Sequence, residues 1–568
     1  MVWKPWLGAV SDASGTHFRV WAPRARALSV SIEGGATAAL RAEGDGYFTA
    51  RVEGVRAGAR YFYRFPDGRA RPDPASLLQP LGVHGPSEVV DLPAIAPRSG
   101  RAGVPLEKLI FCEIHLGTFS SEGTADGAAR FMPELAEAGY SAVEVMPVAA
   151  SPGSRNWGYD GVAPFAAHAD YGGPAGLARL VDAAHGAGLS AFLDVVYNHL
   201  GPEGNYLGEF GPYFTSRHKT PWGDAIDFSL APVRRYFLEN ALRWSAWFDG
   251  LRLDAVHGIV DESTRHILQE IAEGVHEEGG LVVAESDFND PALVDSYGID
   301  ACWADDLHHA LHVALTGESQ GYYQDYQRPM EAMVAALSRG WFYEGQFKPS
   351  FGRKHGKPAA HLPGRRFVVC AQNHDQIGNR ARGERLAALT DIGGLRVAAA
   401  IIALQPALPL YFQGEEWAAK EPFLYFTSHG DQKLAEAVSR GRREEFKAFA
   451  WQGEVPDPQS PETFLRCKLD RSRKDPAALA WHRALLDLRR AHPSLQDDAR
   501  SSLRTWLEGR ILFLRRRDIL LVASFSQSAF VADVPSGRWR ILLDSGQARL
   551  EGGKLRGEGH HAIVLERA

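Results

Sequence analysis

The chain has 568 residues, a formal net charge of −7, 45% hydrophobic residues and 23% charged residues. A single hydrophobic core stops growing near about 250–300 residues, so we expect several domains. The negative net charge gives no sign of a basic surface that could neutralise the phosphate groups of a nucleic acid, which argues against a nucleic-acid partner. A neutral substrate is compatible with this charge.

The sequence predicts a protein without membrane segments. It contains no stretch of about 20 apolar residues, the length that a membrane-spanning helix needs. The first residues, MVWKPWLGAVSDASG, lack a basic segment followed by an apolar run, so we expect no secretory signal. We expect buried free thiols and a reducing, cytoplasmic location, because no CxxC pair occurs among the four cysteines, Cys112, Cys302, Cys370 and Cys467.

The first region, residues 1–93, consists of short apolar runs separated by Gly, Asp and Pro. These runs include THFRVWAP, ALSVSIEG, GYFTARVEG and ARYFYRFP. Short strands with frequent turn signals predict a β-sandwich, which we expect to be immunoglobulin-like and similar to a carbohydrate-binding module. The Pro/Gly/Ala-rich segment LPAIAPRSGRAGVP then indicates a linker.

Residues 94–490 alternate between strand-like runs and amphipathic segments. The eight runs are LIFCEIHLGTF, SAVEVMPV, LSAFLDVVYNH, FDGLRLDAV, LVVAES, IDACWADD, RFVVCAQNHD and ALPLYFQGEEW. Segments such as PAGLARLVDAAHGAG and ESTRHILQEIAEGVHEEG lie between them and have helical spacing. Strands that alternate with helices indicate a parallel sheet, and eight of them predict a closed α/β barrel of the (β/α)8 TIM type.

Two further segments lie outside this alternation. The stretch at about residues 200–230 is polar, aromatic and rich in Gly and Pro, and we expect it to form a small subdomain over the barrel mouth after strand three. Residues 491–568 again contain short apolar runs, which predict a second β-sandwich at the C-terminus.

Polar residues gather at the ends of the predicted strands, where this type of barrel builds its active site. The third, fourth, fifth and seventh runs end in Asp194, Asn198 and His199; Arg252 and Asp254; Glu285; and His374 and Asp375. Burying several acids costs several kcal/mol unless they are paired or functional. We therefore predict an active site built around Asp254, Glu285 and Asp375.

Two carboxyl groups on neighbouring strands suit the hydrolysis of a glycosidic bond with retention. One carboxylate attacks the sugar, a carboxylic acid protonates the leaving oxygen, and the two lie about 5–5.5 Å apart. Because neighbouring strands lie about 4.8 Å apart, we predict Asp254 as nucleophile and Glu285 as general acid. We expect the charge of Asp254 to raise the pKa of Glu285, and Arg252, on the same side of its strand, to keep Asp254 ionised.

Four segments resemble the conserved regions of the α-amylase family, glycoside hydrolase family 13. They are DVVYNH (194–199), GLRLDAVH (250–257), VAES (283–286) and QNHDQ (372–376), in family order. The N-terminal sandwich and the C-terminal β domain also fit, so the resemblance covers the whole chain. It implies that Asp254 is the nucleophile, Glu285 the acid/base and Asp375 the stabiliser of the transition state. It places six residues in the −1 subsite: Tyr159, Asp160, His199, Arg252, His257 and His374.

Further segments resemble one subfamily, whose members cleave the α-1,4 bond next to a terminal trehalose unit and release trehalose. They include EIHLGTFSSEGT, YNHLGPEGNYL, TPWGDAIDF, DDLHHALHVALTGESQGYYQDY, YEGQ and QNHDQIGNRARGERL. Because the rings of trehalose are joined by an α-1,1 bond, they cannot follow the path of a normal maltose end. We therefore expect residues outside the common core to shape the + subsites, namely Trp222 after strand three and Trp341, Tyr343 and Glu344 between strands six and seven.

Three alternatives remain open from the sequence: a branching or debranching enzyme of the same family, a transferase with the same covalent intermediate, and a glycan-binding protein without activity, which would lack one of the three acids.

We expect no cofactor and no metal. His308 and His312 are four residues apart but lack a third ligand, so we expect them in hydrogen bonds. Asn198 matches an amide that some α-amylases use for calcium, but no acidic cluster lies near it in the sequence. The expected partner is an α-glucan capped by trehalose, with no nucleic acid and no membrane.

Overall fold

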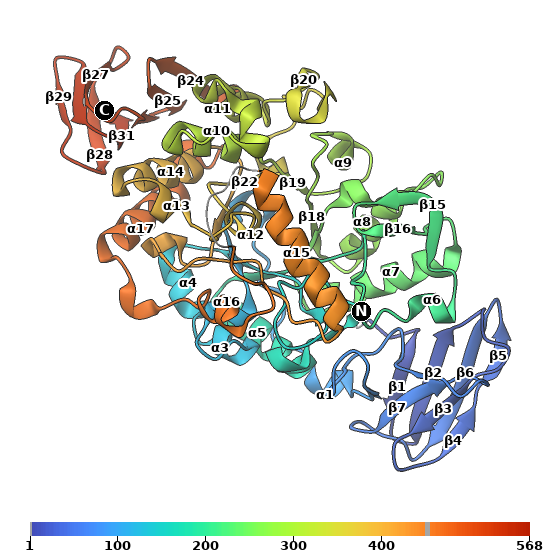
Figure 1. Cartoon of the computed structure of the whole chain (residues 1–568). Helices are drawn as coiled ribbons and strands as arrows, with labels where there is room; N and C mark the ends of the chain where they lie inside the picture. Colours follow the sequence, from blue (N-terminus) through green and yellow to red (C-terminus); the bar gives the residue numbers. More distant parts are fainter. Residues whose placement is uncertain (1–2, 449–454) are drawn as a thin grey trace.

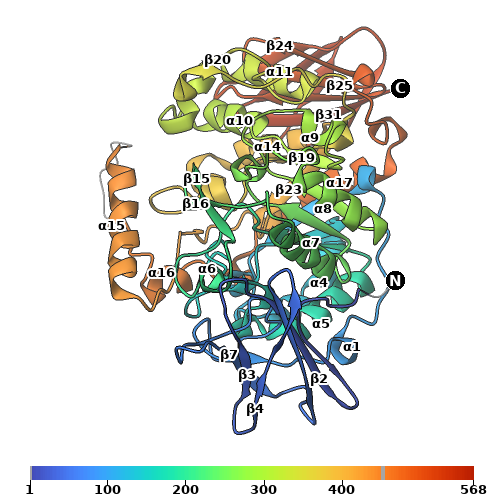
Figure 2. The ribbon, with the colours of Figure 1, turned by 90° about the vertical axis from the view of Figure 1, so that its right-hand side faces the viewer.

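A computed structural model describes residues 3–448 and 455–568 of the chain. A central barrel lies between two β-rich domains, which occupy opposite sides of it in both views (Figures 1 and 2). Among the described residues, no helix is long and apolar enough to cross a membrane.

The N-terminal domain consists of two antiparallel sheets. One sheet has the order β1 (Gly8–Asp12), β2 (Gly15–Trp21), β6 (Tyr47–Glu53), β5 (Arg41–Gly44). The other has the order β4 (Thr37–Ala39), β3 (Ser29–Ile32), β7 (Arg60–Arg64), β8 (Ala70–Arg71), and β9 (Ser87–Glu88) also pairs with β7. Buried aromatic and branched residues such as Phe18, Val30 and Tyr63 fill the space between the sheets. The predicted sheet-rich domain is therefore present.

Eight parallel strands close into the central barrel, as the eight apolar runs predict. In their order around the barrel they are β10 (Phe111–Ile114), β11 (Ala142–Val145), β14 (Ser190–Val195), β17 (Gly250–Leu253), β18 (Leu281–Ala284), β19 (Ala301–Trp303), β22 (Phe367–Cys370) and β23 (Leu408–Phe412). Each strand pairs with the next in sequence and β23 pairs with β10, so all the strand ends that carry the predicted site lie on one side.

Helices connect these strands and cover the outside of the barrel. The longer ones are α4 (Met132–Ala138), α5 (Gly173–Gly186), α7 (Ala231–Ser245), α8 (Ile267–Glu277), α10 (Asp306–Thr316), α11 (Pro329–Arg339), α14 (Ile392–Leu404) and α17 (Pro476–Ala491). The amphipathic segment expected before strand five becomes helical at Ile267, because His266 and Gln269 form a capping box there. The polar residues before it, 262–265, remain outside the helix.

Alternate residues of the barrel strands face its interior and change from apolar to polar toward one end. The apolar layer contains Phe111, Ala142, Phe192, Val283, Ala301, Trp303, Val368, Cys370, Leu408 and Leu410. At Gly250 a Cβ atom would stand 2.1 Å from the ring of Phe192, so this strand needs glycine to admit the aromatic ring. The next inward positions along several strands carry charged residues, and these form the floor of the barrel mouth.

Three excursions surround this mouth. The first follows β14 and contains α6 (Leu207–Phe210) and a hairpin of β15 (Phe214–Thr220) and β16 (Gly223–Ile226), where the sequence predicts a subdomain. The second lies between β19 and β22 and contains α11 and the short strands β20 (Phe347–Lys348) and β21 (Arg353–Lys354). The third follows β23 and contains α15 (Gln432–Ala448) and α16 (Pro461–Leu465). In Figure 2, α15 stands on the same side as the β15–β16 hairpin.

The C-terminal domain also consists of two sheets. The larger has the order β24 (Leu503–Glu508), β25 (Ile511–Arg516), β26 (Ile519–Ser524), β31 (His561–Arg567), β28 (Trp539–Asp544). The smaller has the order β27 (Ala529–Asp533), β30 (Lys554–Glu558), β29 (Arg549–Glu551). Apolar residues from both sheets form a shared core, including Phe513 and Val522 of the larger sheet and Phe530 and Leu555 of the smaller one.

Candidate active site

Asp254 and Glu285 follow two neighbouring barrel strands directly. Strands β17 and β18 pair in parallel, with Leu253 opposite Ala284, so the next residue on each strand is also a neighbour. The ladder of backbone bonds continues past the strand ends, because the amide of Glu285 donates to the carbonyl of Leu253 at 3.0 Å. The two acids therefore share one end of the barrel.

The guanidinium of Arg252 connects these two acids. Arg252 is fully buried, at 0% exposure. It donates to Oδ1 of Asp254 at 2.8 Å, to Oε2 of Glu285 at 2.7 Å and to Oδ2 of Asp194 at 2.8 Å. Since one rigid fork holds them, the bonded oxygens of Asp254 and Glu285 lie within about 8 Å of each other. This bound lies within the range of up to about 9.5 Å over which the paired carboxyls of glycosidases act.

Further hydrogen bonds fix the orientation of both acids. The amide Nδ2 of Asn198 donates to Oδ2 of Asp254 at 2.7 Å and to its backbone carbonyl at 2.8 Å. The backbone amide of Ala255 donates to Oε2 of Glu285 at 2.9 Å. Ala255 has a φ of 38°, a left-handed conformation that is unfavourable for a residue with a Cβ atom. The chain adopts this strain at the residue that directs an amide toward Glu285.

Asp375 and His374 begin α12 (His374–Gly378), which follows β22. The Glu113 carboxylate accepts from Nδ1 of His374 at 2.5 Å, and Nε2 of His374 lies 3.6 Å from Asp375. Burial disfavours the charged imidazole, but Glu113 and Asp375 outweigh it and raise the pKa of His374 to about 10. His374 is therefore a cation at neutral pH. Burial and the nearby Glu285 raise the pKa of Asp375, although the charge of His374 opposes them.

Tyr159 connects Asp194, the third acid bound by Arg252, to His374. Its hydroxyl donates to Oδ2 of Asp194 at 2.7 Å and lies 2.9 Å from Nε2 of His374, and its ring stacks on His374 at 5.2 Å. Burial raises the pKa of Asp194 to about 7, while Arg252 opposes the shift. His199 lies on the same side, with Nε2 2.9 Å from the backbone oxygen of Tyr159. The structure thus brings Tyr159, His199 and His374 to the acids.

Asp160 and His257, the other two predicted −1 residues, are held by neighbours farther out. Asp160 accepts from the side-chain amide of Asn156 at 2.6 Å. His257 accepts from the backbone amide of Asp287 at 3.3 Å and packs against Phe288. The structure therefore does not link either of them directly to the carboxyl groups that the other site residues share.

Trp222 lies in the turn between β15 and β16, and its ring stacks on His199. The ring centroids are 4.6 Å apart and the planes differ by 6°. The other side of the indole is open, because Trp222 is 45% exposed. An exposed aromatic face beside a site histidine is a suitable surface for the apolar face of a sugar.

The predicted residues between strands six and seven are mostly covered. Tyr343 is 3% exposed, and its hydroxyl donates to the backbone oxygen of Asp325 at 2.9 Å. Trp341 is 2% exposed and donates to the carbonyl of Lys357 at 2.7 Å. Glu344 is more accessible and pairs with Arg339 at 2.6 Å. Tyr343 and Trp341 therefore shape this loop from within and do not present a ring at its surface.

Two acids beneath the site were not singled out from the sequence. Glu113 and Glu144 lie opposite each other on β10 and β11, and both are 1% exposed. Glu113 orients His374, whereas no hydrogen bond to the Glu144 carboxyl occurs among the described residues. Burial and repulsion from Glu113 raise the pKa of Glu144 well above its usual range, so it is neutral. The available signal was a glutamate within each apolar run, at an inward-facing position.

The histidine pair and the cysteines have the structural roles expected of them. Nδ1 of His308 lies 2.6 Å from the carbonyl of Ala371, and Nε2 of His312 lies 2.7 Å from Glu318. Within residues 3–448 and 455–568, no group of three His, Cys, Asp or Glu side chains is arranged to hold a metal ion. All four cysteines are buried and free.

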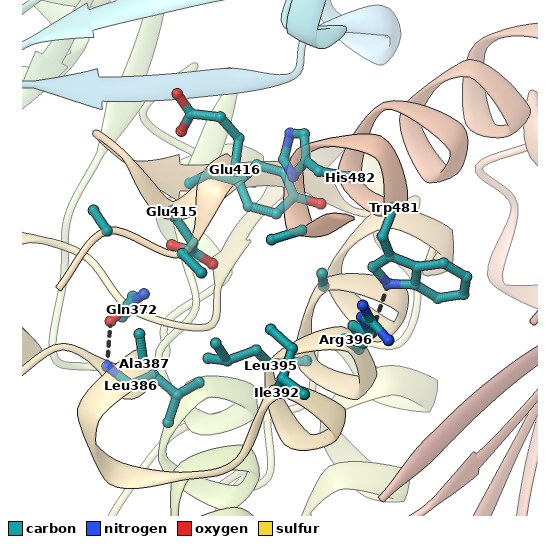
Figure 3. A pocket seen from close by; sticks show the side chains of 16 residues that line it. Gln372, Leu386, Ala387, Ile392, Leu395, Arg396, Glu415, Glu416, Trp481 and His482 are labelled. Carbon is teal, nitrogen blue, oxygen red and sulfur yellow. Dashed lines mark hydrogen bonds between the residues drawn. The ribbon is translucent and has the colours of Figure 1, made fainter. Parts of the chain in front are cut away.

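A second set of buried acids lies away from the barrel mouth, between α14, α17 and the residues after β23 (Figure 3). Glu415, Glu416 and His482 line this small cavity, and burial raises the pKa of Glu415 to about 8. The cavity measures about 30 Å³, which is room for about one water molecule. This cavity is therefore too small to bind a sugar, and its acids do not form a second candidate active site.

The chain is similar to proteins of known family over most of its length. The family described as alpha amylase, catalytic domain, matches residues 82–224. A malto-oligosyltrehalose trehalohydrolase of Saccharolobus solfataricus is 43% identical, over 86% of this chain and 87% of the relative. One of Deinococcus radiodurans is 44% identical, over 90% and 87%. A crystal structure from Salmonella typhimurium, provisionally described as an alpha amylase, is 38% identical and superposes with a TM-score of 0.93 over 100% of both chains.

Proposed function

The chain belongs to the malto-oligosyltrehalose trehalohydrolase family, and we propose that it hydrolyses the α-1,4 bond beside the terminal trehalose unit of malto-oligosyltrehalose and releases trehalose. The reaction proceeds with retention through a covalent glycosyl-enzyme. The observation that carries the chemistry is the pair of acids on adjacent strands that share Arg252. The relatives' printed names support the choice of bond.

In this proposal Asp254 attacks the anomeric carbon of the −1 sugar, and Glu285 protonates the oxygen of the departing trehalose unit. Glu285 then removes a proton from water, whose oxygen attacks the same carbon and frees Asp254. Asp375 stabilises the positive charge that develops on the sugar. Arg252 and Asn198 keep the attacking oxygen of Asp254 oriented, and their hydrogen bonds support this assignment.

The remaining residues bind the sugars in this proposal. Tyr159 and His199 line the −1 sugar together with His374, whose positive charge lies beside the Tyr159 hydroxyl. Asp160 and His257 complete the outer part of the −1 subsite. Trp222 and Glu344 lie at the rim, where the trehalose end leaves the barrel, and Tyr343 shapes the loop that carries Glu344. We further propose that the enzyme acts in the cytoplasm without a cofactor, and four buried free thiols support the reducing location.

The product pattern tests the function. Purified protein is incubated with malto-oligosyltrehalose and, separately, with a maltooligosaccharide of equal length, and the products are separated by chromatography. We expect free trehalose from the first substrate and much slower cleavage of the second. Equal cleavage of both would indicate a general α-glucanase, and new α-1,6 linkages would indicate a branching enzyme. Either result contradicts the proposal.

The two acids are tested by replacing each with its amide. Asp254→Asn and Glu285→Gln remove the nucleophile and the proton donor with little change in volume, so we expect kcat to fall at least about a thousandfold. Proton NMR of the wild-type reaction should show the α anomer of the new reducing end first, as retention requires. A β anomer, or a variant with more than a tenth of the wild-type rate and an unchanged fold, would refute these roles.

A further inference from the structure

Asp305 and Asp306 are consecutive acids directly beyond β19, and only one of them is satisfied by the protein. Asp306 is 4% exposed and accepts from the backbone amides of Phe342 and Tyr343, at 2.6 and 2.9 Å, and from the amide of Asn289 at 3.0 Å. Asp305 is partly exposed. Its carboxyl group has no hydrogen bond and no ion pair in the described part of the chain. Asp306 therefore holds the loop that contains Phe342 and Tyr343. Asp305, in contrast, has a free carboxyl group at a strand end of the barrel mouth.

The charged groups that face Asp305 most strongly are all acids. Glu285 and Asp287 approach it from the end of β18, Asp375 from α12 and Asp306 from α10. Burial, followed by repulsion from these four groups, raises the pKa of Asp305 to about 8. The tyrosines of the neighbouring turn, Tyr322 and Tyr326, have raised pKa values themselves and are neutral.

We propose that Asp305 is a binding residue of the proposed trehalose-releasing reaction, whose free carboxyl group donates a hydrogen bond to an oxygen of the sugar on the leaving-group side. It follows β19, whose neighbours in the barrel are β18, which ends directly before Glu285, and β22, which leads into α12 with Asp375. An ionised carboxylate can only accept hydrogen bonds, whereas a protonated acid can also donate one to a ring or hydroxyl oxygen of a sugar. This inference deepens the proposed function and rests on it.

Three variants of the full chain test the proposal: Asp305→Ala, Asp305→Asn and, as a matched control, Asp295→Asn. Asp295 is a surface acid of α9 (Ala292–Asp295) that pairs with His361 at 2.8 Å. At neutral pH we expect Asp305→Ala to lower kcat/KM for malto-oligosyltrehalose about tenfold, the value of one buried hydrogen bond. Asp305→Asn keeps an uncharged donor and should retain at least a third of wild-type kcat/KM. The control should match the wild type.

The pH profile separates a hydrogen-bond donor from a merely structural residue. Wild-type kcat/KM should fall as the pH rises through about 8, because ionised Asp305 can no longer donate a hydrogen bond to the sugar. In Asp305→Asn this decline should move to higher pH. Thermal melting of each variant accompanies the kinetics, and an unfolded alanine variant leaves the asparagine profile to decide.

The proposal is overturned if a folded Asp305→Ala variant keeps more than half of wild-type kcat/KM, or if the Asp305→Asn profile coincides with that of the wild type. Failure of the proposed function appears differently. In that case the wild type releases no trehalose from malto-oligosyltrehalose, and the same variants are then compared on the α-1,4 glucan that the wild type does cleave.

Discussion

Glu113 determines the charge of His374 and illustrates how one buried residue sets the state of another. The pKa of His374 is about 10 in the folded chain and about 6.5 in an unfolded one. Because the folded value is the higher one, the stabilisation is fully present below about pH 6.5 and is lost as the pH rises through about 10. Glu113→Gln leaves a buried cation without its carboxylate, and such losses cost about 3–5 kcal/mol.

We therefore expect Glu113→Gln to lower the thermal midpoint markedly at pH 7 and to flatten its decline between about pH 7 and 10. Scanning calorimetry across this range measures both effects, and Glu566→Gln serves as the control, because that acid pairs with His492 and Arg540 in the C-terminal domain. A variant whose midpoint declines in parallel with that of the wild type would show that the Glu113 carboxylate does not hold the proton on His374.

The sequence indicated the site residues unequally. Acids and histidines that follow an apolar run directly, such as Asp254, Glu285 and His374, could be found because a barrel places its strand ends together. Glu113 lies inside its run, where the apolar neighbours made it part of a strand. The covered ring of Tyr343 could not be predicted either, since its burial depends on Asp325 and Asp306, which reach it through the fold.

The β15–β16 hairpin carries Trp222 to His199, and in the proposed function this element takes part in binding the substrate. The indole contacts His199 on one face and is 45% exposed. We expect Trp222→Ala to raise KM for malto-oligosyltrehalose about tenfold, because it loses an aromatic surface of a kind worth about 1 kcal/mol or more. The midpoint of thermal unfolding should hardly change, since the side chain is half exposed.

Steady-state kinetics on Trp222→Ala and Trp222→Phe distinguish stacking from other roles. The phenylalanine variant keeps a flat ring and should recover most of the lost affinity. If both variants raise KM equally, then the indole acts through its nitrogen or its size and not through its face. An unchanged KM in the alanine variant would place the sugar elsewhere.

At the scale of elements, the strand-like runs were predicted well, and of the polar excursions the one after β14 was expected but the one after β23 was not. All eight strand-like runs became barrel strands, because a strand buried on both faces needs a continuous apolar run. The excursion after β23, with α15 and α16, was not foreseen. Most of its residues are polar, and α15 has only a narrow apolar face, with Leu434, Val438 and Phe446 at helical spacing. The position of α15 beside the barrel is set by contacts in the folded chain, such as that of Arg442 with the backbone of Gly378, which the sequence does not reveal.

The N-terminal sandwich is joined to the barrel by large side chains that belong to both. The ring of Trp21 meets Tyr213 at 5.0 Å, and the hydroxyl of Tyr236 donates to the carbonyl of Pro74 at 2.7 Å. Phe210 packs against Phe65 of the sandwich at 5.2 Å. Tyr213, Tyr236 and Phe210 are all at most 1% exposed. Part of the surface of α7 and of the excursion after β14 is therefore apolar and depends on the sandwich for cover.

A chain that begins at residue 94 should consequently be less stable than the full chain. Each aromatic residue that loses its cover exposes roughly 100 Å² or more of apolar surface, at about 25 cal/mol per Å². We expect a lower thermal midpoint and a tendency to aggregate, and Trp21→Ala in the full chain should show a smaller effect in the same direction. Val531→Ala, a control in the C-terminal domain where Val531 is 48% exposed, should have no effect. The truncated chain could instead have the same thermal midpoint and the same kcat as the full chain. That result would mean that the sandwich is an appended module and that the barrel covers these aromatic residues by itself.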